Sequence, residues 1–135
     1  MTKTINIFIS HSWSYSKNYK ALLGLLDKTK IKYKNYSVPK DDPIHNAKNE
    51  KELYKAIENQ IKPSSIIIIL AGVYATYSKW INKEIEIAKN GNKKIIAIEY
   101  FGAEKTSTVV KENADEIIKW NSSSLKRAIE NLVGE

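Results

Sequence analysis

The sequence predicts an α/β protein with a doubly wound, five-stranded parallel sheet in the order 2-1-3-4-5 and helices on both faces. Segments typical of strands and of helices alternate about five times along the 135 residues. Two strand segments, "SSIIIIL" (64–70) and "KKIIAIEYF" (93–101), are almost continuously apolar, as is typical of parallel strands that are buried on both faces. No repeat, linker or low-complexity tract divides the chain, so we expect a single domain over residues 1–135.

The remaining strands are expected in shorter or more polar segments. "TINIFIS" is rich in isoleucine, "IKYKNYSV" alternates lysines with larger residues as a half-exposed edge strand does, and "DEIIKW" is a short last strand. Together with the two apolar segments they give five expected strands, at 4–10, 31–38, 64–70, 93–101 and 115–120.

The expected helices carry apolar residues at helical spacing. Leu22, Leu25 and Leu26 mark the helix at 17–28, and Leu53, Ile57 and Ile61 mark a second helix that ends before Pro63. A third helix contains "YSKWINKEIEIA" (77–88) and ends near Asn90–Gly91, which are typical C-terminal cap residues. A closing helix is expected at 122–133. Five strands with this alternation favour the flavodoxin-like order.

Composition excludes several classes of protein. The chain has no cysteine, which excludes disulfides, thiolate zinc sites and cysteine nucleophiles. It has no apolar run long enough to cross a bilayer, and it starts directly with a strand pattern rather than a signal peptide. We therefore expect a cytoplasmic protein without a membrane partner.

The net charge of +7 is concentrated in the first half of the chain, because residues 1–62 hold 12 basic and 6 acidic side chains. A basic half can attract nucleic acid or a dinucleotide phosphate. However, the lysines are scattered and Arg127 is the only arginine in the sequence, although arginine is the usual residue for bidentate recognition of phosphate or guanine. A lysine-rich solvated surface is favoured over a nucleic-acid partner, and an enzyme that acts on nucleic acid stays as an alternative.

The polar and aromatic segments follow the first three expected strands. These segments are "SHSW" (10–13), "PKDDPIH" (39–45) and "AGVYATYSKW" (71–80). In the order 2-1-3-4-5, ligands bind in the crevice outside the carboxyl ends of strands 1 and 3. The three segments are therefore expected to converge on one edge of the sheet, where a binding site is favoured.

Several chemistries that use this architecture lack their sequence pattern. The glycines form neither a phosphate-binding loop nor a dinucleotide fingerprint, and the acidic pair of a phosphate-receiving response regulator is missing. Ser10 or Ser12 beside His11 could suggest a hydrolase, but no nucleophile elbow is present. Asp41, Asp42 and His45 are suitable metal ligands without a defined spacing, so a proline-bounded loop is favoured and no metal site is predicted.

Trp80 and Glu84 are four residues apart and therefore project from nearly the same side of the third helix. On pattern alone, Trp80 could be a core anchor and Glu84 a solvated helix residue. Against this, Ile81, Ile85 and Ala88 already supply a core stripe, so Trp80 lies beside it. The tyrosines of the preceding loop, Tyr74 and Tyr77, add aromatic surface at the predicted crevice.

The stretch Trp80-Ile81-Asn82-Lys83-Glu84 resembles the W-x-x-x-E pattern of TIR domains that cleave NAD⁺. "INIFISHS" resembles the first TIR box, and Lys40-Asp41-Asp42-Pro43 resembles the family's loop after its second strand. "FISHSW", "NYSVPKDDPIH", "PSSIIIILAGVYATYSKWINKEI" and "ADEIIKWN" are most similar to the bacterial TIR-like branch that includes the signalling subunit of Thoeris antiphage systems.

The resemblance implies an NAD⁺ nucleosidase or ADP-ribosyl cyclase in antiviral defence, with NAD⁺ as substrate and no cofactor. It implies Glu84 as the catalytic carboxylate. Further residues are expected to bind the substrate, namely Trp80, Phe8, Ser10, His11, Asp42 and Tyr77. The nucleotide product would activate a separate effector protein, and the active form would be a homo-oligomer. A TIR-like interaction module without catalysis is the main alternative.

Overall fold

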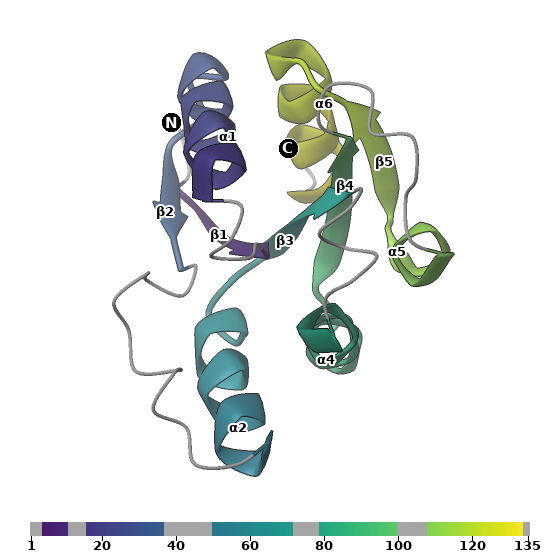
Figure 1. Ribbon diagram of the computed structural model, residues 1–135. Helices are drawn as coiled ribbons and strands as arrows, with labels where there is room; N and C mark the ends of the chain where they lie inside the picture. Colours follow the sequence, from purple (N-terminus) through teal and green to yellow (C-terminus); the bar gives the residue numbers. More distant parts are fainter. Residues whose placement is uncertain (1–3, 11–15, 37–49, 72–78, 100–107, 134–135) are drawn as a thin grey trace.

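The structure is a computed structural model that describes residues 4–10, 16–36, 50–71, 79–99 and 108–133. Five parallel strands form one sheet in the order β2-β1-β3-β4-β5 (Figure 1). The strands are β1 (Ile5–Ser10), β2 (Tyr33–Asn35), β3 (Ile66–Ala71), β4 (Lys94–Glu99) and β5 (Glu116–Lys119). The helices are α1 (Ser16–Lys28), α2 (Glu50–Ile61), α4 (Lys79–Asn90), α5 (Thr108–Asn113) and α6 (Ser122–Val133). The predicted fold class and strand order are confirmed.

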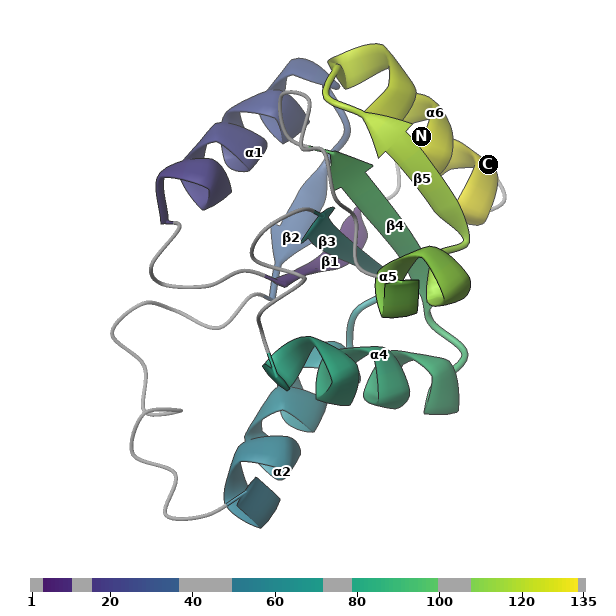
Figure 2. The same ribbon diagram turned by 45° about the vertical axis from the view of Figure 1, so that its right-hand side comes forward.

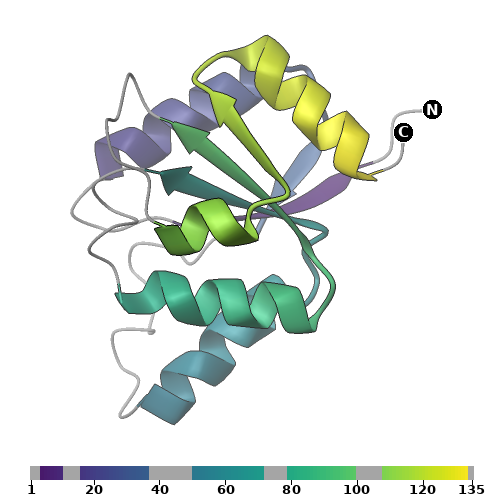
Figure 3. The ribbon, with the colours of Figure 1, turned by 90° about the vertical axis from the view of Figure 1, so that its right-hand side faces the viewer.

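The helices cover the two faces of the sheet. Figure 3 shows α1 and α6 on one face and α2, α4 and α5 on the other. Close-packed isoleucines of β3 and β4 fill the space between these layers, and Ile66 to Ile69 are fully buried. Such continuous burial explains why these strands show no alternation of apolar and polar residues.

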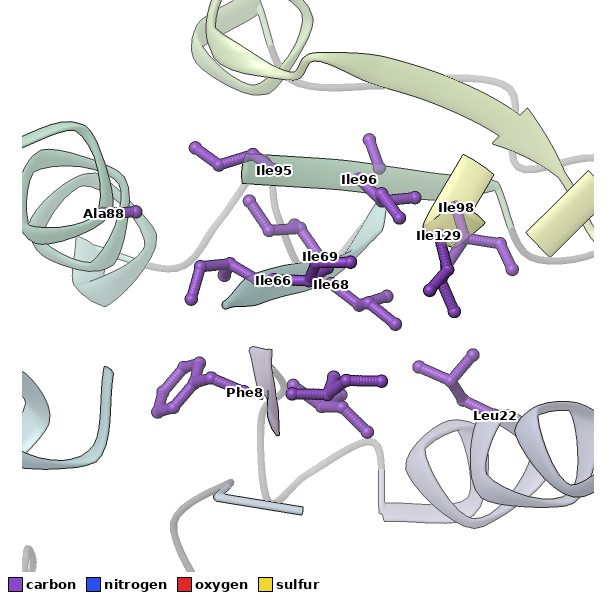
Figure 4. Close-up of a cluster of buried hydrophobic side chains, with 14 of the residues drawn as sticks. Phe8, Leu22, Ile66, Ile68, Ile69, Ala88, Ile95, Ile96, Ile98 and Ile129 are labelled. Carbon is purple, nitrogen blue, oxygen red and sulfur yellow. The ribbon is translucent and has the colours of Figure 1, made fainter. Parts of the chain in front are cut away.

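Side-chain direction alternates along each strand and so assigns residues to a face. In Figure 4, Phe8 and Ile95 point toward the side on which Ala88 of α4 lies, whereas Ile98 lies near Ile129 of α6. Parallel pairing places Phe8 beside Ile67 and Ile67 beside Ile95, in one row across three strands.

Three details differ from the predicted elements. The edge strand β2 is limited to Tyr33–Asn35, because only these residues pair with β1 within the described part of 31–38. The short helix α5 was not predicted, since Thr108–Asn113 offers fewer than two turns of pattern. The left-handed residue after α4 is Asn92, with φ 58°, rather than the predicted cap pair Asn90–Gly91.

Hydrogen bonds explain the role of Asn92. The Lys93 amide donates to the Ala88 carbonyl at 2.8 Å and the Asn92 amide donates to the Lys89 carbonyl at 3.1 Å. These two bonds form a Schellman motif in which Asn92 occupies the left-handed position. The motif fixes how α4 turns into β4.

Candidate functional site

The carboxyl ends of β1 and β3 form the edge at which the sequence predicts a site. β1 ends at Ser10, which lies in register with Ile69 of β3, and Ile69 lies in register with Ala97 of β4. β1 is flanked by β2 on one side and β3 on the other, so the chain reverses its direction of winding here. This is the position where open α/β sheets bind ligands.

Glu84 is buried against the sheet. It lies one helical turn before Ala88, which is fully buried and faces the sheet in Figure 4. The Glu84 side chain is 7% exposed, so the alternative of a solvated helix residue is wrong. α4 thus carries a carboxylate on the face that would ordinarily be apolar.

Glu84 differs from the other buried polar residues in the part of the chain that is described. These are Thr29 and Ser64, whose hydroxyls donate to the Leu26 carbonyl at 2.6 Å and to the Gln60 carbonyl at 3.1 Å. Both side chains satisfy backbone groups where a helix ends. Glu84 is in the middle of α4, away from both helix ends, and a buried carboxylate is costly for folding. Such a residue is a candidate for function.

Chain geometry places Glu84 near the carboxyl half of the sheet. Six residues separate Glu84 from Asn90 at the end of α4, roughly 9 Å at the rise of a helix. Figure 3 shows that α4 begins on the side of the sheet where the strands end, so Glu84 lies nearer that side than Ala88 does.

Contacts with α2 hold α4 in this orientation. Figure 2 shows α2 beside α4, on the same side of the sheet. The Tyr54 hydroxyl of α2 hydrogen-bonds to Glu86 and Asn90 of α4, and the Lys93 ammonium donates to the Lys62 carbonyl at 2.8 Å. Burial raises the pKa of Tyr54 above 10.0, and the Glu86 carboxylate raises it further by accepting a hydrogen bond and by its charge.

A second carboxylate lies at the end of β4. Glu99 forms an ion pair with Lys119 at 3.1 Å, between in-register residues of β4 and β5. Glu99 is four residues beyond Ile95 and therefore on the same face of the sheet as α4. Glu99 is not among the residues predicted from the sequence, although an acid at the carboxyl end of an apolar strand is a usable signal.

Comparison with known families identifies the chain. The sequence model of "Thoeris protein ThsB, TIR-like domain" matches residues 8–105. The chain belongs to this family. The match includes the end of β1 and all of β3, α4 and β4, and therefore contains Glu84 and Glu99.

Solved structures similar to this ThsB-family domain confirm the fold. The RPS4 and RRS1 TIR domain heterodimer superimposes with a TM-score of 0.59 at 11% identity, covering 98% of this chain and 100% of that chain. The CMP N-glycosidase BcmB of Clostridium botulinum gives 0.55 at 18% identity, covering 93% and 98%. Phosphoheptose isomerase GmhA of Neisseria gonorrhoeae gives 0.54 at 7% identity, covering 96% and 72%. A comparison with curated proteins gives no significant match.

The structure describes the predicted site residues of the ThsB-family domain to different extents. Glu84 is buried within α4, and Phe8 is 1% exposed, within the core, and points toward the α4 face of the sheet. Ser10 ends β1 and Trp80 is in the first turn of α4, but their side chains are outside the described part. The other predicted residues also lie outside it, namely His11, Asp42 and Tyr77. The predicted role of each residue stays a prediction.

Two further properties concern only the described residues. None of their helices is long and apolar enough to cross a membrane. Their aspartate and glutamate side chains form no group of three that could bind a metal ion, and Asp41, Asp42 and His45 lie outside this part.

Proposed function

We propose that this ThsB-family domain is an NAD⁺-cleaving enzyme in which Glu84 is the catalytic carboxylate. The observation that carries the proposal is the burial of Glu84 on the same side of α4 as Ala88, which faces the sheet. Its position in the family's W-x-x-x-E pattern supports the same role.

The chemistry requires little more than a well-placed negative charge. When the bond between C1′ of ribose and the nicotinamide nitrogen breaks, its electron pair goes to that nitrogen and cancels the ring's positive charge. C1′ then carries oxocarbenium character, as in glycoside cleavage. A carboxylate in a poorly hydrated site stabilises this cation more strongly than one in water. Glu84 would also accept hydrogen bonds from the ribose hydroxyls.

Capture of C1′ decides the product. Attack by water, with loss of a proton, gives ADP-ribose and nicotinamide. Attack by an atom of the same nucleotide gives a cyclic ADP-ribose, and this route is favoured where aromatic side chains exclude water. Trp80, Ser10, Asp42 and Tyr77 are the residues proposed to shape this cavity, together with Phe8 and His11. The cationic nicotinamide ring would stack on Trp80, an interaction of about 0.5–2 kcal/mol.

The family supports a wider role in Thoeris antiphage defence. The product would then act as a signal that activates a separate effector protein, and the active enzyme would be an assembly of several copies in the cytoplasm. At the level of the fold, the similar CMP N-glycosidase shows that this architecture can hold a site for N-glycosidic cleavage, which is an analogy only.

Mass spectrometry of NAD⁺ incubated with concentrated protein tests the proposal. The protein is assayed purified and in lysate from phage-challenged cells. We expect a product from the wild type and a loss of at least about 100-fold in Glu84→Gln. Glu130→Gln is the matched control, because Glu130 is exposed on α6, on the opposite face of the sheet. Circular dichroism shows that each variant is folded.

The competing function is a TIR-like interaction module without turnover. The heterodimer formed by the similar RPS4 and RRS1 TIR domains favours this alternative. It predicts no product from assembled wild-type protein and no effect of Glu84→Gln in cells. Salt-sensitive DNA binding with loss of function in Asp42→Ala, while Glu84→Ala stays active, would instead support an enzyme acting on nucleic acid.

A further inference from the structure

Lysines that are scattered in the sequence come together at the edge of the sheet where the strands begin. They belong to the turns that lead into β2, β3 and β4, at 29–32, 62–65 and 91–94. Figure 3 shows the turns before β3 and β4 on the side away from the strand ends. The three turns contain no acidic side chain. Their lysines, which we call the lysine edge, are Lys30, Lys32, Lys62, Lys93 and Lys94.

Backbone hydrogen bonds make the lysine edge one continuous surface. The Ile5 amide of β1 donates to the Lys32 carbonyl at 2.9 Å, and the Ser65 amide donates to the Asn6 carbonyl of β1 at 2.8 Å. The Lys94 amide donates to the Ser65 carbonyl at 3.4 Å. The turns before β2, β3 and β4 are therefore joined through the start of β1. From β2 to β4 there are three strand spacings, or roughly 14 Å.

The positive charge of the lysine edge is not neutralised within the described part of the chain. Lys30, Lys32, Lys62 and Lys94 are exposed there and form no ion pair. Lys93 is half-buried, and its ammonium donates to the Lys62 carbonyl at 2.8 Å, which brings a second positive charge to the same turn. Like charges that are gathered in this way repel one another and oppose folding. A surface that keeps them is a candidate for binding an acidic partner.

Acidic side chains that flank the lysine edge are engaged in other contacts. The Tyr33 hydroxyl donates to the Asp27 carboxylate at 3.2 Å. The Ile95 amide donates to the Asp115 carboxylate at 2.7 Å. Glu58 is one helical turn farther back on α2. The lysine ammonium groups are therefore left to carboxylates from another molecule.

We propose that the lysine edge is a docking surface for an acidic segment of a partner protein. An extended peptide presents the side chains of one face roughly 7 Å apart, so about five residues match the roughly 14 Å from β2 to β4. Alternate aspartates or glutamates would then face the lysines. The inference does not rest on the proposed NAD⁺ cleavage, because the strands begin and end on opposite sides of the sheet.

A protein partner fits this surface better than nucleic acid does. The only arginine of the chain, Arg127, is on α6 and not in these turns. Arginine is the usual residue for bidentate contacts with phosphate, whereas a lysine ammonium is a point charge that pairs with a single carboxylate. The three turns also hold no aromatic side chain on which a base could stack.

Fluorescence anisotropy with a fluorescein-labelled decaglutamate peptide tests the proposal, at about 150 mM salt so that long-range attraction is screened. The double variant Lys32→Glu/Lys94→Glu reverses the charge at both ends of the lysine edge. Lys20→Glu/Lys126→Glu is the matched control, because it changes the net charge equally at exposed positions in the first halves of α1 and α6. Circular dichroism shows that each variant is folded.

We expect the wild type to bind decaglutamate but not decaglutamine. The affinity should fall at least about tenfold in Lys32→Glu/Lys94→Glu and stay within about twofold of wild type in the control. No binding by the wild type, or an equal loss in both double variants, would overturn the proposal. Tighter binding of duplex DNA or of phosphatidylserine vesicles than of decaglutamate, lost in the same variant, would assign the surface to another class of partner and overturn it too.

Discussion

The Tyr54 hydroxyl on α2 donates a hydrogen bond to the Glu86 carboxylate on α4, two residues after Glu84. This bond ties the helix that carries the candidate catalytic residue to its neighbour. We expect Tyr54→Phe to lower the midpoint of thermal unfolding, because Glu86 and Asn90 lose a shared partner. Lys55→Ala, on the same helix with an exposed side chain, is the control and should leave the midpoint unchanged.

The same contact predicts a loss of stability in alkali. The pKa of Tyr54 is raised above 10.0 in the folded protein, first by burial and then by Glu86, so the folded state holds its proton more tightly than the unfolded state. This stabilisation is complete below pH 10.0 and is lost as the pH rises through the folded pKa. The free energy of unfolding, measured with urea across that pH range, should fall more steeply with pH for the wild type than for Tyr54→Phe. Parallel curves would contradict the assignment.

Glu84→Gln should separate stability from activity. If Glu84 is retained for chemistry, replacing its buried charge with an amide of the same shape leaves the free energy of unfolding within about 1 kcal/mol of wild type, or raises it. If Glu84 instead serves a structural ion pair, its loss costs about 3–5 kcal/mol. Denaturant unfolding of the two proteins distinguishes these cases. A large loss of stability in Glu84→Gln would show that the buried Glu84 has a structural role.

The turn between α4 and β4 allows a matched pair of substitutions. Asn92→Ala should cost about 1 kcal/mol, because Asn92 has φ 58° and alanine tolerates this left-handed conformation poorly. Gly91→Ala should be neutral or stabilising by about 0.5 kcal/mol. A Cβ at Gly91 would meet the flexible Lys93 side chain at 3.4 Å. The opposite order of stabilities would show that Gly91 is the cap.

Isoleucines of the sheet should differ in their contribution to the free energy of unfolding according to how deeply they are buried. Ile68 is fully buried in the central strand β3, so Ile68→Ala should cost about 2–5 kcal/mol of unfolding free energy. Ile117, in the edge strand β5, is 45% exposed, and Ile117→Ala should change stability by about 0.5 kcal/mol or less. Similar losses for the two variants would contradict the observed burial.

The strand order could be predicted because the strand patterns and the helix patterns of the sequence indicate it independently of each other. The apolar run 66–69 requires burial on both faces, and the amphipathic helix 50–61 begins and ends where its pattern does. The short elements could not be predicted as well. β2 has three residues that pair with a single neighbour, and tertiary contacts rather than local pattern decide its length.

The site was predictable in part. The four-residue spacing of Trp80 and Glu84 indicates a shared helix side, but it does not say whether that side faces water or the sheet. The structure places Glu84 inside. The ion pair of Glu99 with Lys119 could not be predicted, because it depends on the register of β4 and β5, and register arises from pairing between strands.

Parallel pairing also shapes how the chain acquires its structure. Ile7 of β1 lies in register with Ile66 of β3, so the central strand pair joins residues separated by nearly half of the chain. Contacts of such sequence separation form slowly, because a long loop must close before they contribute. The apolar β1 therefore stays exposed until α1, β2 and α2 have been synthesised. We expect nascent chains that end before β3 to depend on chaperones, and the domain to fold only after most of it has left the ribosome.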